Sequence, residues 1–189
     1  MTVGVKSWQN LPMSSKTIDH PTAAAKEWRP IFEALLRHVA EAGQEAYGPR
    51  LRALVVFGSV GRGTPRPDSD IDLLIVAEDL PEGRIARVSE FAAVERRLAP
   101  ALAEAAANGV HTVLSPVFRT PTELQRGSLL MLDLVDDARV LVDRDDTFAN
   151  AVNRLQARLR DLGARRVWVG NAWYWDLKPD YRIGEVFEL

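Results

Sequence analysis

Apolar residues at helical spacing predict three long helices along the chain. The helices are expected from Pro21 to Gly43 or Gly48-Pro49, from Gly83 to about Ala107, and from Asp146 to Leu162. The apolar side of the second helix is expected to be formed by Ile85, Val88, Phe91, Val94, Leu98 and Leu102. Pro100 is expected to kink or divide this helix, because proline lacks a backbone donor and clashes with the preceding turn.

Short apolar runs bounded by turn residues predict four strands. The expected strands are Leu51–Phe57, Ile71–Val76, Val110–Phe118 and Arg139–Val142. Pro116 favours an edge or a bulge for the third strand, and the apolar run Ser128–Val135 fits either a helix or a strand. Together these elements predict an α/β (α+β) fold in which helices flank a small mixed β-sheet.

The pattern also suggests how the chain is divided. Residues 1–20 are polar and aperiodic, so we expect an N-terminal arm there. Residues 21–143 hold the predicted sheet and form the main domain. Residues 144–189 are expected to form a C-terminal helix and an aromatic-rich tail that packs on the same domain, since so many large rings disfavour disorder.

Composition narrows the classes of function. With 189 residues, 47% of them hydrophobic, the chain can bury a core, and its net charge of −2 is dispersed. No basic face is indicated, so long nucleic acid is not an expected partner, whereas a small anion can be bound by a few arginines. The absence of cysteine excludes disulfides and thiolate metal sites. With no signal-like or membrane-length apolar run, we expect a cytoplasmic protein without a membrane partner.

The candidate functional residues lie in the segment Val55–Val76, where Asp70 and Asp72 stand at the start of the second predicted strand. Carboxylates two residues apart on a strand share a face, and without a cation between them each raises the pKa of the other. A hard cation is therefore expected at this pair. Mg²⁺ is the natural candidate, and because it also takes phosphate oxygens it implies a nucleotide substrate.

The end of the first predicted strand offers groups for a phosphate. Gly58 lets backbone amides approach an anion, Ser59 adds a hydroxyl donor, and Arg62 can bind a phosphate through two hydrogen bonds. A Gly-Ser turn or an Asp-x-Asp motif alone is common on protein surfaces. Their combination, each on its own apolar strand, is much more specific.

The segment GSVGRGTPRPDSDIDLLIV resembles the signature of the polymerase-beta-like nucleotidyltransferase superfamily, especially its small prokaryotic minimal nucleotidyltransferase branch. The order of predicted elements is similar up to about residue 118. We expect residues 21–143 to form a nucleotidyltransferase domain. The resemblance implies transfer of a nucleoside monophosphate from a nucleoside triphosphate to an acceptor. Asp70 and Asp72 would bind catalytic Mg²⁺, and Gly58, Ser59 and Arg62 would hold the triphosphate. A protein side chain, a small alcohol and an RNA end all stay open as acceptors.

The chain departs from the pattern of this family at one point. Active members usually carry a third carboxylate on the strand after the second helix, and Val110–Phe118 holds only His111 and Ser115 as polar substitutes. The nearest acids downstream are Glu123, which fits a helix cap with Thr120, and Asp133, which has apolar neighbours and could be buried, although a capping or turn role is favoured.

Asp136 and Asp137, further along, are interpreted as turn residues. An incomplete site keeps a second hypothesis open: a catalytically degenerate nucleotide-binding or antitoxin-like protein, whose partner, by resemblance alone, would be a helical protein of the HEPN family.

Overall fold

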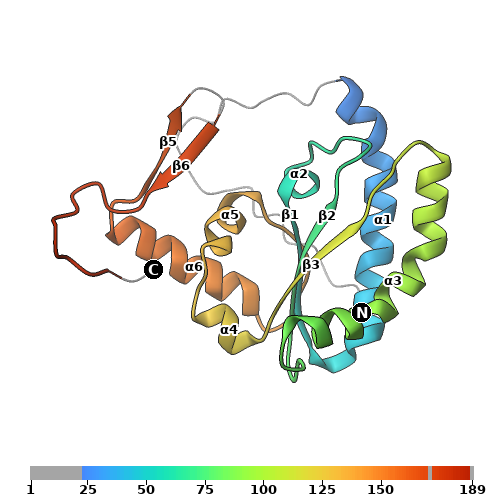
Figure 1. Cartoon of the computed structure of the whole chain (residues 1–189), viewed down its shortest axis with the longest axis horizontal. Helices are drawn as coiled ribbons and strands as arrows, with labels where there is room; N and C mark the ends of the chain where they lie inside the picture. Colours follow the sequence, from blue (N-terminus) through green and yellow to red (C-terminus); the bar gives the residue numbers. More distant parts are fainter. Residues whose placement is uncertain (1–22, 170–171, 188–189) are drawn as a thin grey trace.

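A four-stranded mixed sheet lies at the centre of the computed structural model, which describes residues 23–169 and 172–187 (Figure 1). The strands are β1 (Leu51–Phe57), β2 (Ile71–Ala77), β3 (Leu114–Arg119) and β4 (Arg139–Asp143), in the order β3-β2-β1-β4. β1 is antiparallel to β2 and β4, and β3 is parallel to β2. The predicted mixed sheet is confirmed, whereas the arm predicted for residues 1–20 lies outside the described residues.

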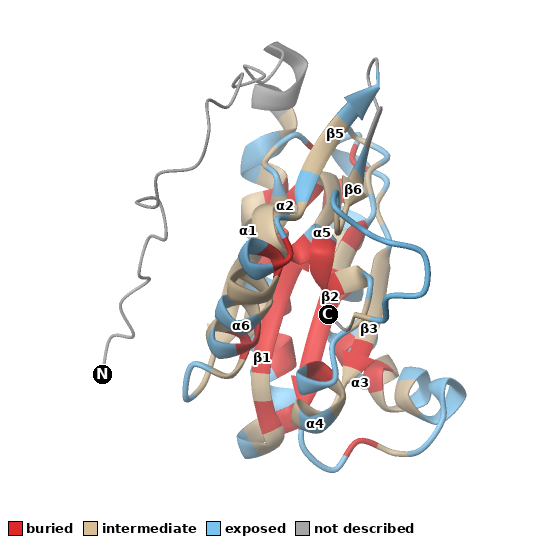
Figure 2. Cartoon of the chain, turned by 90° about the vertical axis from the view of Figure 1, so that its left-hand side faces the viewer, coloured by how far each residue is buried: buried red, intermediate tan, exposed pale blue. Residues whose placement is uncertain are grey.

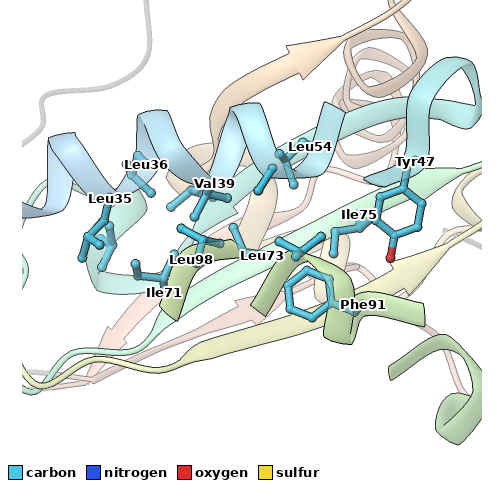
Figure 3. Close-up of a cluster of buried hydrophobic side chains, with 14 of the residues drawn as sticks. Leu35, Leu36, Val39, Tyr47, Leu54, Ile71, Leu73, Ile75, Phe91 and Leu98 are labelled. Atoms are coloured by element: carbon cyan, nitrogen blue, oxygen red, sulfur yellow. The ribbon is translucent and has the colours of Figure 1, made fainter. Parts of the chain in front are cut away.

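Helices cover both faces of the sheet (Figure 1). α1 (Ala23–Tyr47) and α3 (Arg84–Ala107) lie on one face, and α4 (Pro121–Gln125), α5 (Leu130–Asp137) and α6 (Thr147–Asp161) lie on the other. Leu73 and Ile75 of β2 pack toward α1 and α3 (Figure 3), and Leu74 and Val76 pack toward α4, α5 and α6. Because both faces are covered, β1 and β2 are almost wholly buried (Figure 2).

Short elements complete the chain. A 3₁₀ turn (Gly48–Arg50) leads into β1, and α2 (Gly58–Gly61) is a single helical turn directly after it. β5 (Arg165–Val169) and β6 (Ala172–Asp176) form an antiparallel hairpin beyond α6. Within the described residues, no helix combines the length and the apolar composition that a membrane span requires.

Most of the predicted elements are confirmed, and α3 provides the main correction. It runs through Pro100 as one helix, so the proline does not divide it. Phe91 is buried as predicted, but Ile85 is 88% exposed and Val88 39% exposed. Helical spacing identifies one face of a helix, but it does not show how far the neighbouring elements extend, and the first turns of α3 lie outside the core cluster.

The start of the third strand is a second correction, because β3 begins at Leu114 and not at Val110. The amide of Val110 donates to the carbonyl of Ala105 at 2.9 Å, which closes the end of α3. The amide of His111 donates to the carbonyl of Pro67 at 2.7 Å, so these residues bind separate groups before the ladder begins. Pro116 is on an edge strand, as predicted, since β3 pairs with β2 alone within its sheet.

Two segments for which the sequence predicted no definite element form regular secondary structure. The run Ser128–Val135 contributes to α5 and is helical from Leu130. The aromatic tail contains the β5–β6 hairpin, in which the guanidinium of Arg166 lies 5.4 Å from the ring centroid of Trp175. Arg166 also forms an ion pair of 3.0 Å with Asp136, which joins the hairpin to α5.

Candidate active site

The turn after β1 brings the main chain against Asp72. Gly58 has a φ of +66°, a left-handed conformation that side chains other than glycine rarely adopt. A Cβ added at Gly58 would lie only 2.2 Å from Oδ2 of Asp72. The loop then closes through the amide of Thr64, which donates to the carbonyl of Ser59 at 3.0 Å. Both the conformation and the close approach therefore require glycine at this position.

Strand pairing places the glycine turn after β1 next to the acid pair at the start of β2. Antiparallel pairing puts Phe57, the last residue of β1, opposite Asp72 of β2. Asp70 is exposed and lies one residue before β2, while Ile71 between the two acids is buried in the core. Partial burial raises the pKa of Asp72, and the negative charge of Asp70 raises it further. The two carboxylates therefore lie close enough to repel each other.

Ser115 faces the dyad from the neighbouring strand. The parallel register of β2 and β3 pairs Asp72 with Ser115, and the Ser115 hydroxyl donates a hydrogen bond to the Asp72 carboxylate. This bond favours the charged form, so it lowers the pKa of Asp72 and partly offsets the effect of burial. His111 is exposed and precedes β3. The residue paired with Asp72 on the third strand is thus a serine and not a carboxylate.

The other candidate acids have different positions. Asp133 is exposed on α5, so the interpretation that it could be buried is wrong. The helix cap predicted for Glu123 is confirmed: the amide of Glu123 donates to Oγ1 of Thr120 at 3.1 Å, and the amide of Thr120 donates to Oε2 of Glu123 at 2.9 Å. Arg87 also donates two hydrogen bonds of 2.8 Å to the Glu123 carboxylate. Among the described residues, no three histidine, aspartate or glutamate side chains form a possible metal site.

Arg62 lies beside the dyad but also contacts an acid that sequence reasoning did not place there. Its Nη1 donates to Oδ2 of Asp137 at 2.8 Å. Asp137 is the last residue of α5, so its interpretation as a turn residue is wrong. The two residues are 75 positions apart in the sequence, and no local pattern marks such a contact.

The carboxylates of Asp70 and Asp72 fit a magnesium ion chemically. Mg²⁺ commonly takes one or two protein carboxylates and completes its shell with water and substrate phosphates, so it does not require a third acid. A cation between the two acids would also remove the repulsion that raises the pKa of Asp72. The site is therefore compatible with the ion that the motif predicts.

Comparison with known families agrees with this geometry. Residues 36–116 match the model of the nucleotidyltransferase domain, a range that includes β1, the loop after it, β2 and α3. This part of the chain is therefore similar to a nucleotidyltransferase domain. The match agrees with the family that the motif predicts. The matched range ends at Pro116, so α4, α5, α6 and the hairpin lie outside it.

The individual proteins that resemble this chain have low sequence identity to it. A curated protein of Methanocaldococcus jannaschii, named as a candidate protein adenylyltransferase, MJ1305, is 28% identical over 121 residues, which cover 63% of this chain and 77% of that protein. Two solved structures cover 71% of this chain and 92% of their own chains. One is a toxin-antitoxin with AMP-PNP (21% identity, TM-score 0.37), and the other is the toxin-antitoxin MntA-HepT (17% identity, TM-score 0.38).

Proposed function

We propose that this domain transfers a nucleoside monophosphate, in the first instance AMP, from a nucleoside triphosphate to a hydroxyl group of a protein, with Mg²⁺ bound at Asp70 and Asp72. The observation that supports the proposal is the close approach of the Gly58 turn to Asp72, because a loop that is proposed to bind phosphate then lies beside a proposed metal ligand. The family match supports nucleotidyl transfer, and the name of the curated relative supports AMP and a protein acceptor.

The residues of the site have separate roles in this reaction. Gly58 lets the main chain approach the triphosphate, and the Ser59 hydroxyl donates a hydrogen bond to it. Asp70 and Asp72 would hold the metal, and the hydrogen bond from Ser115 would keep the Asp72 carboxylate oriented. When bound, Mg²⁺ supplies charge neutralisation at the phosphate oxygens and helps to align the reacting groups.

Label transfer from α-labelled ATP tests this proposal. The parent protein is incubated with Mg²⁺, ATP and candidate acceptor proteins, beside Asp70→Asn and Asp72→Asn. Each substitution should reduce transfer by at least about 100-fold, since it removes a proposed metal ligand. Asp68→Asn is the matched control, because Asp68 is an exposed acid of the same loop, and it should stay within about twofold of the parent. Equal labelling by the parent and both dyad variants would refute the proposed site.

A second candidate function is nucleotide binding without turnover, in an antitoxin-like protein with a helical HEPN-type partner. Ser115 favours this candidate, because it occupies the position opposite Asp72 on the strand where the third acid is expected. The same incubation separates the two candidates. Binding of ATP with Mg²⁺ but no label transfer by the parent, with every acceptor offered, would support the second candidate.

A further inference from the structure

The contact between Arg62 and Asp137 joins the motif loop to a helix outside the matched family range. Only one guanidinium nitrogen, Nη1, takes part in the hydrogen bond to Asp137. The Arg62 side chain stays 48% exposed, whereas that of Asp137 is only 14% exposed. The acid is thus the fixed partner, and one edge of the guanidinium remains open toward solvent.

Asp137 is held firmly by its surroundings. α5 packs on the sheet through Met131 and Leu134, which belong to the core cluster on that face. At the end of this helix, the carbonyl oxygen of Asp137 lies against Gly61, where an added Cβ would come within 2.6 Å of it. The last residue of α5 therefore touches the motif loop twice, through its carbonyl at Gly61 and through its carboxylate at Arg62.

Arg62 in turn lies near the dyad. Its amide donates to the carbonyl of Gly58 at 3.1 Å, and Gly58 is the residue whose main chain lies against Asp72. Arg62 is therefore located between the partly buried carboxylate of Asp137 on one side and the proposed triphosphate site on the other. An arginine held by a carboxylate at one nitrogen can still offer its other N–H groups to a phosphate.

We propose that Asp137 is a positioning residue, which fixes Arg62 so that the exposed edge of the guanidinium faces the triphosphate bound at Gly58 and Ser59. This inference rests on the proposed function. A flexible, exposed acid would compete with phosphate for the arginine, but Asp137 is nearly buried at the end of a packed helix. Its carboxylate therefore orients Arg62 and remains bound to it when the nucleotide enters.

The test measures the affinity for ATP with Mg²⁺ by calorimetry in the full chain. Arg62→Ala should weaken binding by about 10-fold or more, because a charge-assisted hydrogen bond is lost. Asp137→Asn should weaken it by about 3- to 10-fold, and the double variant should bind about as weakly as Arg62→Ala alone, since both changes act through one group. Asp137→Glu, which retains the charge, should recover part of the affinity.

Asp136→Asn is the matched control, because Asp136 is the adjacent acid of α5 and its 3.0 Å ion pair goes to Arg166 of the hairpin. It should bind ATP within about twofold of the parent. Hydrogen exchange without nucleotide gives a second readout. Asp137→Asn should accelerate exchange in residues 58–64, and Asp136→Asn should not.

Three results would overturn the inference while ATP binding by the parent is intact: unchanged affinity in Asp137→Asn, tighter binding in Asp137→Asn, or independent effects that multiply in the double variant. If Asp137→Asn is too unstable for calorimetry, Asp137→Glu and the loop exchange rates decide in the same way. If the parent protein itself does not bind ATP with Mg²⁺, the proposed function is refuted together with this inference. That outcome is distinguishable, because it appears in the parent before any variant is compared.

Discussion

Replacement of Gly58 by alanine should damage the site in a way that the structure makes quantitative. The substitution adds one methyl group, but at a φ of +66° and toward the Asp72 carboxylate. The new Cβ would lie 2.2 Å from Oδ2, whereas ordinary van der Waals contact begins at 3.4 Å. Either the turn or the carboxylate must therefore move by about 1 Å.

Two costs add up in this variant. An L side chain in the left-handed region costs about 1–2 kcal/mol, and relief of a steric overlap costs about 1–3 kcal/mol more. We therefore expect Gly58→Ala to lower the free energy of unfolding by about 2–5 kcal/mol. A displacement of about 1 Å at a reacting centre can reduce the rate by about 100-fold, so nucleotidyl transfer should fall by about that factor.

Gly63→Ala is the matched control for the backbone term. Gly63 belongs to the same loop and has a φ of +75°, but its added Cβ would meet only Nη2 of Arg29, at 3.6 Å. Urea denaturation should show a loss of about 1–2 kcal/mol for this variant, and label transfer from α-labelled ATP should stay within about threefold of the parent. The difference between the two alanine variants isolates the contact with Asp72.

Equal effects of the two substitutions on stability and on transfer would refute this reasoning, because the contact of Gly58 with Asp72 would then contribute nothing beyond backbone strain. The same conclusion would follow if Gly58→Ala retained full transfer.

Three further predictions concern the cap of α4, the third strand and the core. Arg87 holds the pKa of Glu123 at about 2, below its usual 4.5, so this pair stabilises the fold above pH 4.5 and loses its effect as the pH falls toward 2. Since Glu123 is 35% exposed, Glu123→Gln should cost only about 1–2 kcal/mol at pH 7, a difference that urea denaturation should show disappearing near pH 2. Ser115→Asp places a third acid opposite Asp72; it should lower the melting temperature without Mg²⁺, by charge repulsion, and tighten Mg²⁺ binding by about 10-fold in a thermal-shift titration. Phe91→Ala empties a position that is only 1% exposed and should lower the free energy of unfolding by about 3–5 kcal/mol in urea denaturation.

Each of these predictions has a result that contradicts it. A constant difference between Glu123→Gln and the parent from pH 7 to pH 2 would show that the ion pair does not stabilise the fold. Unchanged Mg²⁺ affinity in Ser115→Asp would show that this strand position does not face the metal. If Phe91→Ala lowered the free energy of unfolding by less than about 1 kcal/mol, the surrounding core would be able to collapse around the smaller side chain.

Much of the fold was predictable because the relevant signals are local. β1 and β2 are short, mainly apolar runs bounded by turn residues, and a strand that is buried on both faces is apolar along most of its length. The cap of α4 depends on Thr120 and Glu123, three residues apart, so its two hydrogen bonds form within one turn. The Gly-Ser turn and the acid pair flank one loop, and the antiparallel pairing of its two strands brings them together.

Other features depend on how distant segments dock. The exposure of Ile85 follows from the extent of the neighbouring elements, which helical periodicity does not encode. Residues 110–113 match the composition of a strand, but the amide of Val110 donates to the end of α3 and the amide of His111 donates to the carbonyl of Pro67. In both cases the local preference is weak, and tertiary contacts decide the outcome.

The sequence by itself determined the strands of the sheet and the pair of carboxylates beside a glycine turn, and it carries the resemblance to the family, because these are encoded over short, contiguous stretches. Only the tertiary structure decided what surrounds that pair. It places Ser115 opposite Asp72 through the parallel register of β3, and it places Asp137 against Arg62 through the packing of α5. Such contacts between distant residues arise from the summed burial of many apolar side chains, so no local pattern can specify them.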